Sequence, residues 1–383
     1  MRRPRGVGDH KFCQASKSTK FRGPAHIFPR QNVLDMHTLL RHALASPLAH
    51  RSFHASAARS TAAIQPLRRI ANLGDRPNDR ELMTPQTAQG DLLYGTHSIE
   101  AALTSNSRTT YHAFYAVGTK GEEDVQNDAQ EKAIQHRGRL ARKAEAFNVP
   151  IHWVSRQELN RLLPPGASGS SGGVALDCSP LDNVHSITCA SDLDAMCQQA
   201  PVDNQCVLFV DEVQDPQNLG STLRCALFLG TAGVCISGKN SAPLSPSVSR
   251  ASSGALEILA AQGRLTYSKG PLPTLLKHMK EQDWNIVGTV VNDQRAVPLS
   301  KAPTDRSKTR RESGGGGGDV GSTAEGGNKI AIVMGNEGHG MRKMVKRGCT
   351  TLVTLPASMG SSSCNSLNVS VTAALVMNHY LQE

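Results

Sequence analysis

Apolar and polar residues alternate in short runs from about residue 90 onward, and these runs fall into two blocks. The first block, about 90–182, combines β-branched and aromatic runs with stretches that repeat at helical spacing. Its predicted strands are Tyr111–Val117, Ile151–Val154 and Val174–Leu176, and its predicted helices are Ala129–Phe147 and Arg156–Leu163. We therefore expect a small α/β domain over 90–182, with a Gly/Ser loop between Gly166 and Gly173.

The second block, 203–383, alternates strands and helices more regularly. Its predicted strands are Cys206–Val210, Gly233–Ser237, Trp284–Val291, Lys329–Met334 and Thr350–Leu355. Its predicted helices are Ser221–Leu229, Leu272–Gln282 and Asn368–Leu381. Strands separated by helices indicate a mostly parallel sheet with helices on both faces. One interruption is expected at 303–328, where charged residues and the Gly314–Gly318 run predict a disordered surface insertion.

The composition agrees with this organisation. A chain of 383 residues with 38% hydrophobic residues can form two domains of ordinary size. It lacks an uncharged apolar run of about eighteen residues, which a membrane-spanning helix would need, so we expect a soluble protein without a membrane partner. Nine cysteines without a Cys-x-x-Cys pair argue against a disulfide framework and a structural zinc site. We expect reduced thiols and no metal.

The positive charge is concentrated at the beginning of the chain. Residues 1–60 hold eleven Lys and Arg against two acidic residues, a net of +9, which leaves +1 of the total +10 for everything after them. The basic balance therefore says little about binding of nucleic acid. Instead, an Arg-rich, Ser-rich and acid-poor N-terminus is typical of a mitochondrial import signal.

An amphipathic stripe supports the import signal. Leu40, Leu44 and Leu48 recur at helical spacing within the acid-free stretch Met36–Ser60. We expect residues 1–60 to be a mitochondrial presequence with an upstream tail, Met36 to be the biological start, and 61–89 to be a polar linker. The mature protein would then reside in the mitochondrial matrix. The alternative is a disordered basic tail that binds RNA.

Three loops that follow predicted strands or precede predicted helices carry the candidate chemistry. In a parallel sheet, ligands bind at loops beyond the carboxyl ends of the strands. The first loop, 215–224, reads Asp-Pro-Gln-Asn-Leu-Gly-Ser-Thr-Leu-Arg. Pro216 and Gly220 predict a turn, and we expect Asn218 and Arg224 to lie together at a helix N-terminus, which suits anions. The alternative is an ordinary capped helix with a surface arginine.

The second loop, 334–341, reads Met-Gly-Asn-Glu-Gly-His-Gly-Met. Its glycines allow a ligand to approach the backbone. The spacing differs from the Gly-x-Gly-x-x-Gly fingerprint of dinucleotide-binding proteins, no acidic residue occurs in Thr351–Thr354, and the chain has no Walker lysine motif. These observations disfavour a dehydrogenase and a P-loop ATPase.

The third loop ends in Ser366-Leu367-Asn368, immediately before the last predicted helix. Ser366 has the position of a helix N-cap, a structural role that it can have whatever else it does. Taken together, Asn-x-Gly-x-x-x-Arg at 218–224, Gly-x-Glu-Gly at 335–338 and Ser-Leu-Asn-Val-Ser at 366–370 resemble the three motifs of the SpoU family of RNA 2′-O-ribose methyltransferases, within the SPOUT superfamily. Arg-Ala-Ser-Ser-Gly-Ala-Leu at 250–256 is also similar to that family.

Residues 91–182 resemble the small N-terminal substrate-binding domain of the same family. Two positions depart from the family pattern. Gly172 stands where the family often has Gln, which affects expected RNA contacts, and the third motif is about three residues longer around 361–365. The sequence Ser-Leu-Asn-Val-Ser itself is intact.

The resemblance implies an α/β-knot fold for 203–383, in which the C-terminal segment threads through an earlier loop. It also implies a homodimer whose sites draw on both subunits, with S-adenosyl-L-methionine as the cofactor. Carried over by position, the resemblance places Gly335, Gly338, Leu355 and Leu367 at the cofactor.

The resemblance assigns catalysis to Arg224. A guanidinium stays protonated in proteins, so we expect Arg224 to fix the phosphate and stabilise charge on the attacking oxygen rather than to act as a base. Asn218, Glu337, Ser366 and Asn368 are expected to position the substrate and the loops around it.

The expected substrate is a guanosine of mitochondrial large-subunit ribosomal RNA, because the import signal and the extra N-terminal domain together resemble the mitochondrial ribosomal branch of the family. Two alternatives stay open. One is an enzyme with the same chemistry that acts on transfer RNA. The other is a non-catalytic RNA-binding factor in ribosome assembly.

Overall fold

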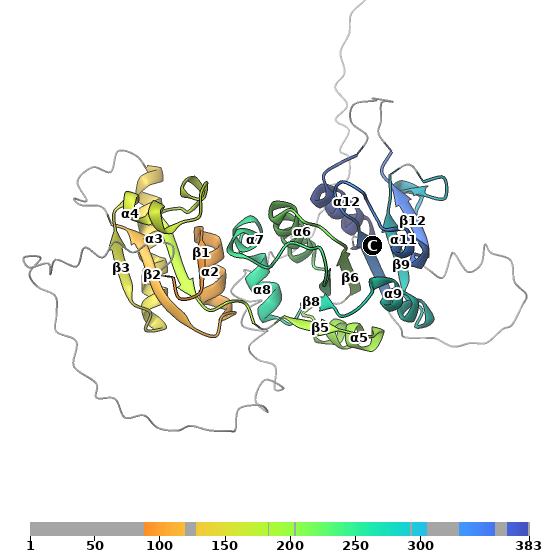
Figure 1. The fold of residues 1–383 in the computed structure, drawn as a ribbon, viewed down its shortest axis with the longest axis horizontal. Coiled ribbons are helices and arrows are strands. Elements are labelled where there is room, and N and C mark those ends of the chain that lie inside the picture. Colours follow the sequence, from red (N-terminus) through yellow and green to blue (C-terminus); the bar gives the residue numbers. More distant parts are fainter. Residues whose placement is uncertain are drawn as a thin grey trace, which may run out of the picture. The chain divides into compact units, whose positions relative to one another are not determined.

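The larger domain in the computed structural model is built on a sheet of eight strands (Figure 1), in which all neighbouring strands are parallel. Their order across the sheet is β10-β12-β9-β11-β6-β7-β8-β5. The strands are β5 (His185–Ile187), β6 (Gln205–Val210), β7 (Gly233–Ser237), β8 (Leu265–Ser268), β9 (Asn285–Thr289), β10 (Val297–Pro298), β11 (Lys329–Met334) and β12 (Thr351–Thr354). The mostly parallel sheet expected from the sequence is confirmed.

The structure describes residues 88–118, 128–182, 184–202, 204–291, 293–304, 329–356 and 366–381, which belong to one compact unit of the chain. The predicted presequence, the linker up to residue 87 and nearly all of the predicted insertion lie outside these ranges. Within the described ranges, no helix combines the length and the apolar character needed to cross a bilayer.

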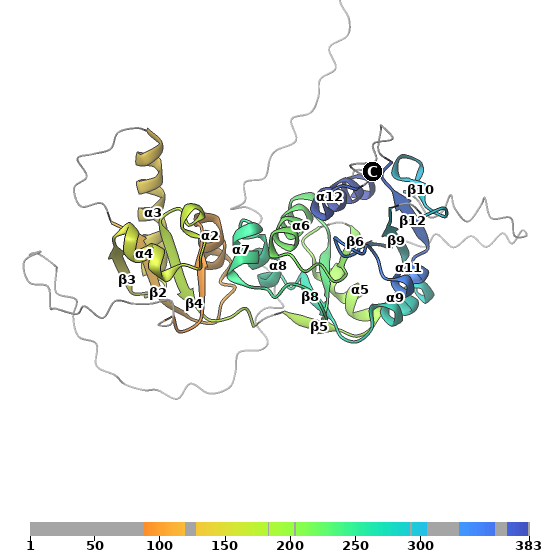
Figure 2. The same cartoon turned by 45° about the horizontal axis from the view of Figure 1, so that its top comes forward.

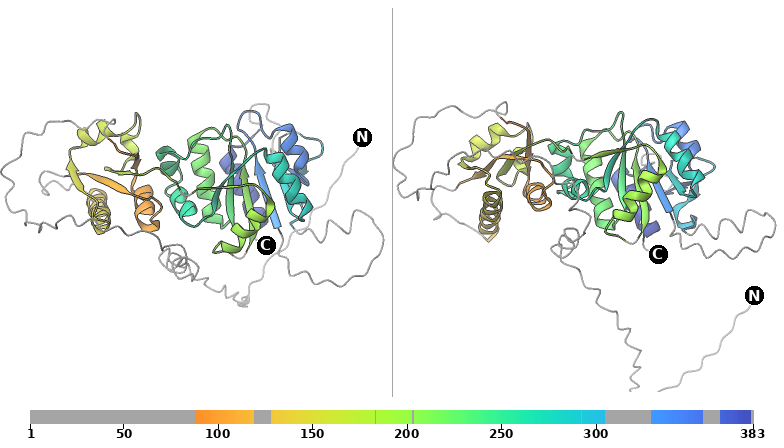
Figure 3. Two further views of the ribbon diagram at one scale, coloured as in Figure 1. Left: turned by 60° about the horizontal axis from the view of Figure 1, so that its bottom comes forward. Right: turned by 90° about the horizontal axis from the view of Figure 1, so that it is seen from below.

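Helices cover both faces of the large sheet (Figures 2 and 3). They are α5 (Ala190–Gln199), α6 (Pro216–Leu229), α7 (Pro246–Ala251), α8 (Ala255–Ala261), α9 (Leu272–Glu281), α11 (Lys343–Gly348) and α12 (Val369–Leu381). Alternate residues of a strand point to opposite faces, so Leu208 and Val210 of β6 join the core under α6, α8 and α12. Val207 and Phe209 join the core under α5, α9 and α11.

The small domain contains a four-stranded sheet in the order β1-β4-β2-β3. Its elements are β1 (Asp91–Tyr94), α2 (Thr96–Ser105), β2 (Tyr111–Val117), α3 (Asp128–Ala146), β3 (Ile151–Val154), α4 (Arg156–Leu162) and β4 (Val174–Cys178). Strands β2 and β3 are parallel, whereas β4 runs antiparallel to both β1 and β2. The core on one face includes residues of α2 and α3, and the core on the other includes residues of α4.

A buried ion pair joins the small domain to α8 of the larger one. The side chains of Arg108 and Glu257 are both 0% exposed, with Nη2 and Oε1 2.7 Å apart. Glu257 also accepts hydrogen bonds from Ser107 and Ser249, and Arg108 contacts Asp91. Burial alone would lower the pKa of Arg108, but the hydrogen bonds with Glu257, the charge of Glu257 and the hydrogen bond with Asp91 together raise that pKa above its ordinary value. Each buried charge thus has its partner across the junction.

Two details of the larger domain differ from the sequence-based expectation. Pro216 and Gly220 do not form a turn, because α6 already begins at Pro216 after an Asp215 cap, and Gly220 lies inside the helix. A Cβ atom at Gly220 would lie 2.5 Å from the Cβ of Ala251, so this glycine serves the close packing of α6 on α7. The expected domain start at residue 203 is also too late, since β5 at 185–187 already pairs with β8.

Candidate functional site

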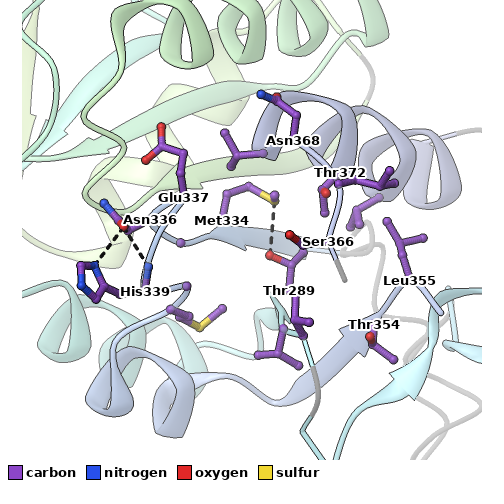
Figure 4. A pocket seen from close by; sticks show the side chains of 18 of the residues that line it. Thr289, Met334, Asn336, Glu337, His339, Thr354, Leu355, Ser366, Asn368 and Thr372 are labelled. Atoms are coloured by element: carbon purple, nitrogen blue, oxygen red, sulfur yellow. Dashed lines mark hydrogen bonds between the residues drawn. The ribbon is translucent and has the colours of Figure 1, made fainter. Parts of the chain in front are cut away.

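A cavity of about 560 Å³ lies at the carboxyl ends of β9, β11 and β12 (Figure 4). These strands are neighbours in the parallel sheet, and the ends of parallel strands are where such sheets bind ligands. Most of the lining comes from the end of β9 at 289–291, the loop 334–341 after β11, the end of β12 at 353–355 and the start of α12 at 366–369. Asn218, Lys346, Thr372 and Val376 complete it.

Eight of the nine site residues expected from the sequence line this cavity. They are Asn218, Gly335, Glu337, Gly338, Leu355, Ser366, Leu367 and Asn368. The three loops singled out in the sequence therefore meet at one place, although they lie far apart along the chain. Arg224, the ninth residue, is not among the lining residues.

Asn218 connects the three loops through its carboxamide. Its Nδ2 donates to Glu337 Oε1 at 3.1 Å, and its Oδ1 accepts from Asn368 Nδ2 at 2.7 Å. Glu337 and Asn368 are exposed and Asn218 is half-buried, so the carboxylate and the Asn368 amide are open to a substrate as well as to Asn218. The carboxamide thereby orients one carboxylate and one amide at the mouth of the cavity.

Asn368, rather than Ser366, caps the last helix. Helix α12 begins at Val369, and Asn368 Oδ1 accepts hydrogen bonds from the backbone N–H and the hydroxyl of Ser370. The N-cap role considered for Ser366 is therefore taken by Asn368, and Ser366 lies two residues earlier on the cavity wall. A capping bond of this kind fixes the position of the helix start.

The loop after β11 is held in shape by Asn336. Its Oδ1 accepts hydrogen bonds from the backbone N–H groups of Gly338 and His339, and its Nδ2 donates to the carbonyl of Glu212. Gly335 faces the returning chain, because a Cβ atom there would lie 2.5 Å from the nitrogen of Met341. Gly335 therefore allows the loop to close tightly on itself, where a side chain would collide with the backbone.

An ion pair anchors the far end of this loop to β6. The Arg342 guanidinium contacts both carboxylate oxygens of Asp211, with Nε 3.0 Å from Oδ2, and Nη1 lies 3.1 Å from Glu212 Oε1. Asp211 is only 1% exposed and follows β6 directly. Hydrogen bonding to Asp211 raises the pKa of Arg342. The two residues fix where the loop ends and α11 begins.

Arg224 lies on the exposed side of α6, outside the cavity lining. Its Nη1 donates to Ser253 Oγ at 3.2 Å, in the turn between α7 and α8. The expected pairing of Asn218 and Arg224 at a helix N-terminus is not observed. That N-terminus also has an anion of its own, because the Asp215 carboxylate accepts from the N–H groups of Gln217 and Asn218.

The sequence of this domain matches a known family. Residues 205–378 fit the model of the SpoU rRNA methylase family, a range that includes all nine candidate residues. The larger domain is thereby identified as a SpoU methylase domain.

Relatives of this SpoU protein include mitochondrial and bacterial enzymes. The human protein named rRNA methyltransferase 1, mitochondrial, is 28% identical over 80% of this chain and 79% of its own length. The Schizosaccharomyces pombe protein of the same name is 28% identical over 75% of this chain and 88% of its own. The 23S rRNA (guanosine-2′-O-)-methyltransferase RlmB of Acinetobacter baylyi is 27% identical over 76% of this chain and 96% of its own length.

A solved structure shares the fold of the SpoU protein. The crystal structure of an RNA 2′-O ribose methyltransferase aligns with a TM-score of 0.51 and 20% identity, over 76% of this chain and 87% of its own. The expected α/β fold class of SPOUT methyltransferases, with a small N-terminal α/β domain, is confirmed. Residues 357–365, in the segment expected to form part of the knot, lie outside the described residues.

The cavity of the SpoU domain fits a nucleoside cofactor in size and chemistry. A volume of about 560 Å³ falls in the usual range for small-molecule sites. Val290, Val353 and Leu367 provide an apolar surface suited to a purine ring, and the 335–341 loop provides backbone hydrogen-bonding groups. In the part of the chain that the structure describes, no group of three or more His, Cys, Asp or Glu residues could hold a metal ion.

Several residues at the SpoU site were not predicted. Thr289–Val291, Lys346 and Thr372 line the cavity. The signal for the first of these was present, because 289–291 ends a predicted strand and should therefore lie at the ligand-binding edge of the sheet. The Asp211–Arg342 pair had no such signal.

Proposed function

We propose that this SpoU protein transfers a methyl group from S-adenosyl-L-methionine to the ribose 2′-hydroxyl of a guanosine in mitochondrial large-subunit ribosomal RNA. The observation that carries the proposal is the meeting of the three sequence motifs at one cavity with a glycine-rich loop. The activities in the names of the mitochondrial and bacterial relatives support the reaction and the substrate class.

The cavity would hold the cofactor mainly through backbone groups. Gly335 and Gly338 line the cavity, and a side chain is lacking at exposed Gly338, while Leu355 and Leu367 flank the loop from the neighbouring segment. The bound cofactor supplies an already activated methyl group on a sulfonium ion. The protein must therefore act on the poor nucleophile, the ribose hydroxyl.

Arg224 is assigned to the attacking oxygen and its adjacent phosphate. A planar guanidinium can bind a phosphate with two hydrogen bonds and stabilise negative charge that develops on the hydroxyl oxygen. The hydroxyl oxygen would accept the methyl group that the bound cofactor supplies, and its proton would leave to the phosphate or to water. Asn218, Glu337, Ser366 and Asn368 hold the ribose in line, which supplies further acceleration.

The position of Arg224 supports the proposal that the enzyme is a homodimer. On α6, Arg224 and Phe228 are four residues apart and both are exposed, so they share one face. Phe228 is 89% exposed, and Val371 and Leu375 on the adjoining α12 are 47% and 44% exposed. A second copy that covers these apolar side chains would bring Arg224 into an enclosed site between two subunits.

Replacing Phe228 with glutamate should therefore convert the dimer to a monomer, because burial of a carboxylate in an apolar interface is unfavourable. Analytical ultracentrifugation of the full chain measures this directly. Phe147→Glu is the matched control, since Phe147 is a 42% exposed aromatic residue of the small domain. A Phe228→Glu protein that sediments like the wild type would contradict the proposed interface.

The proposed location is the mitochondrial matrix. The acid-free, Arg-rich stretch from Met36 to Ser60 supports it, as do the names of the human and yeast relatives. Transfer RNA is a second candidate substrate, because the motifs define the ribose reaction and not the RNA that carries it.

Mapping of ribose methylation across mitochondrial RNA tests the proposal as a whole. Loss of this protein should abolish methylation at a guanosine of the large-subunit ribosomal RNA and leave other sites unchanged. Restoration by wild-type protein, but not by an Arg224→Ala variant, would attribute the change to catalysis. Loss at a transfer RNA site would favour the second candidate substrate. No change at any site would exclude an enzyme of mitochondrial RNA and leave the non-catalytic assembly factor.

A further inference from the structure

A second group of side chains gathers where β2 and β3 of the small domain end, and none of them lines the cavity. Its central member is Arg137 of α3, which is 8% exposed. Among the described residues, no group accepts a hydrogen bond from Arg137 and no carboxylate pairs with it. A nearly buried cation without a counter-ion is unfavourable, so this position is suited to an anion from outside the protein.

The backbone beside Arg137 keeps the guanidinium in place. Gly173 has a φ of +77°, and a Cβ atom there would lie 3.3 Å from Arg137 Cδ and 3.4 Å from its Nη1. The side chain of Arg137 therefore lies directly over a residue that has none. Gly172 and Gly173 form the segment whose sequence departs from the family pattern.

A second cation lies close to Arg137. Burial lowers the pKa of Arg137, and the positive charge of Arg156 at the start of α4 lowers it further. Two arginines that repel each other, with no acidic residue between them among the residues that the structure describes, create a positive potential. A phosphate group between them would remove that repulsion and accept the planar, forked hydrogen bonds of a guanidinium.

An exposed indole lies at the same end of the small sheet, on the far side of β2 from Gly173. Trp153 lies on the edge strand β3 and is 58% exposed, and a Cβ atom at Gly118 would lie 3.5 Å from the Cβ of Trp153. The backbone connects these positions: Gly118 donates to the carbonyl of Val154, and Val117 donates to the carbonyl of Gly173. Trp153 and Arg137 are thus linked through the ends of adjoining strands.

We propose that Arg137, Arg156 and Trp153, here called the Arg137 cluster, bind single-stranded RNA. The arginines would bind a backbone phosphate, and an unpaired base would stack on the indole face. Stacking of splayed bases on aromatic side chains, with phosphates held by basic residues, is how proteins grip single-stranded RNA. The choice of RNA as the ligand rests on the proposed function, whereas the anion and the flat apolar face are features of this domain itself.

The tryptophan content of the chain allows a direct test. There are two tryptophans, and Trp284 is 0% exposed in the core of the larger domain. In a Trp284→Phe protein, emission therefore reports on Trp153 alone. A single-stranded RNA oligonucleotide should quench this emission in a saturable manner, because a stacked base quenches indole fluorescence. If the Trp284→Phe protein is unstable, the difference in quenching between wild type and Trp153→Phe gives the same information.

Binding affinities measured by fluorescence anisotropy of labelled RNA provide the second test. Trp153→Ala should weaken binding by about fivefold or more, the loss expected for one stacked base. Arg137→Gln should weaken binding and reduce the dependence of log K on log salt by about one unit, as for one lost phosphate contact. Arg139→Gln removes the same charge two residues along α3, but Arg139 already lies 3.8 Å from Glu100, so this control should change little.

Two further measurements distinguish failure of the Arg137 cluster from failure of the proposed function. Inorganic polyphosphate, which has no bases, should compete with RNA without quenching Trp153. S-adenosylmethionine binding should be unchanged in all three variants, because the cluster is outside the cavity lining. RNA binding with full affinity in Trp153→Ala and Arg137→Gln, and without quenching, would overturn the cluster while leaving methylation intact. Quenching by RNA in a protein that methylates no RNA would overturn the proposed function and keep the cluster.

Discussion

Replacement of Arg224 with alanine is expected to lower the single-turnover rate of RNA methylation by about a hundredfold or more, the usual effect of losing one charge-stabilising donor. The reason is that Arg224 is assigned to the developing charge on the ribose oxygen and to its phosphate. Binding of S-adenosylmethionine, measured by calorimetry, should barely change, because Arg224 does not line the cavity. Arg224→Lys should restore only part of the rate, since a point charge does not reproduce the planar fork.

Arg347→Ala is the matched control for Arg224. Arg347 is an exposed arginine of the same domain, on α11, whose recorded contact is with the sulfur of Met344. Its loss should leave the methylation rate within about twofold of the wild type. An Arg224→Ala enzyme with a near-normal single-turnover rate would remove Arg224 from the mechanism, whatever the rate of the control.

Replacement of Arg108 with methionine should lower the free energy of unfolding by about 3–5 kcal/mol, the range measured when one member of a buried ion pair is removed. The cause is Glu257, which keeps its two serine donors but loses the cation that compensates its buried charge. Denaturant unfolding followed by circular dichroism measures the loss. Hydrogen exchange should show that it is concentrated in α2 and α8, the helices beside the pair.

The double variant Arg108→Met with Glu257→Leu should recover much of the lost stability, because no unpaired buried charge remains in it. Arg139→Met serves as the surface control. Arg139 is 58% exposed at its side chain, and exposed pairs of this kind contribute little. Equal stability of Arg108→Met and wild type would show that the two domains do not depend on this junction.

The sequence predicted well the central strands that are buried on both faces. Strands β7 and β11 have the predicted bounds because nearly every residue in them is apolar, as parallel strands between two helical layers require. Strand β5 was missed because two of its three residues are exposed and only Ile187 reaches the core. Helices α7 and α8 have six and seven residues, too few to show a helical period.

The meeting of the three motifs could be predicted, since each belongs to an element of one parallel sheet. The orientation of Arg224 could not. Its place on α6 depends on where the helix begins, and Asp215 sets that start five residues earlier than the apolar pattern suggested. The Arg342–Asp211 pair could not be predicted either, because nothing in either local sequence identifies a partner that lies 131 positions away.

The hydrogen bonds of Asn218 make completion of the site depend on the last helix. They connect residues 119 and 150 positions apart along the chain, and the second connection requires the start of α12. Contacts between such distant segments form late, because a long loop must close first. The cavity lacks the wall formed by Asn368, Thr372 and Val376 until α12 has been made. A nascent chain therefore has no complete cavity before α12 has been synthesised and packed.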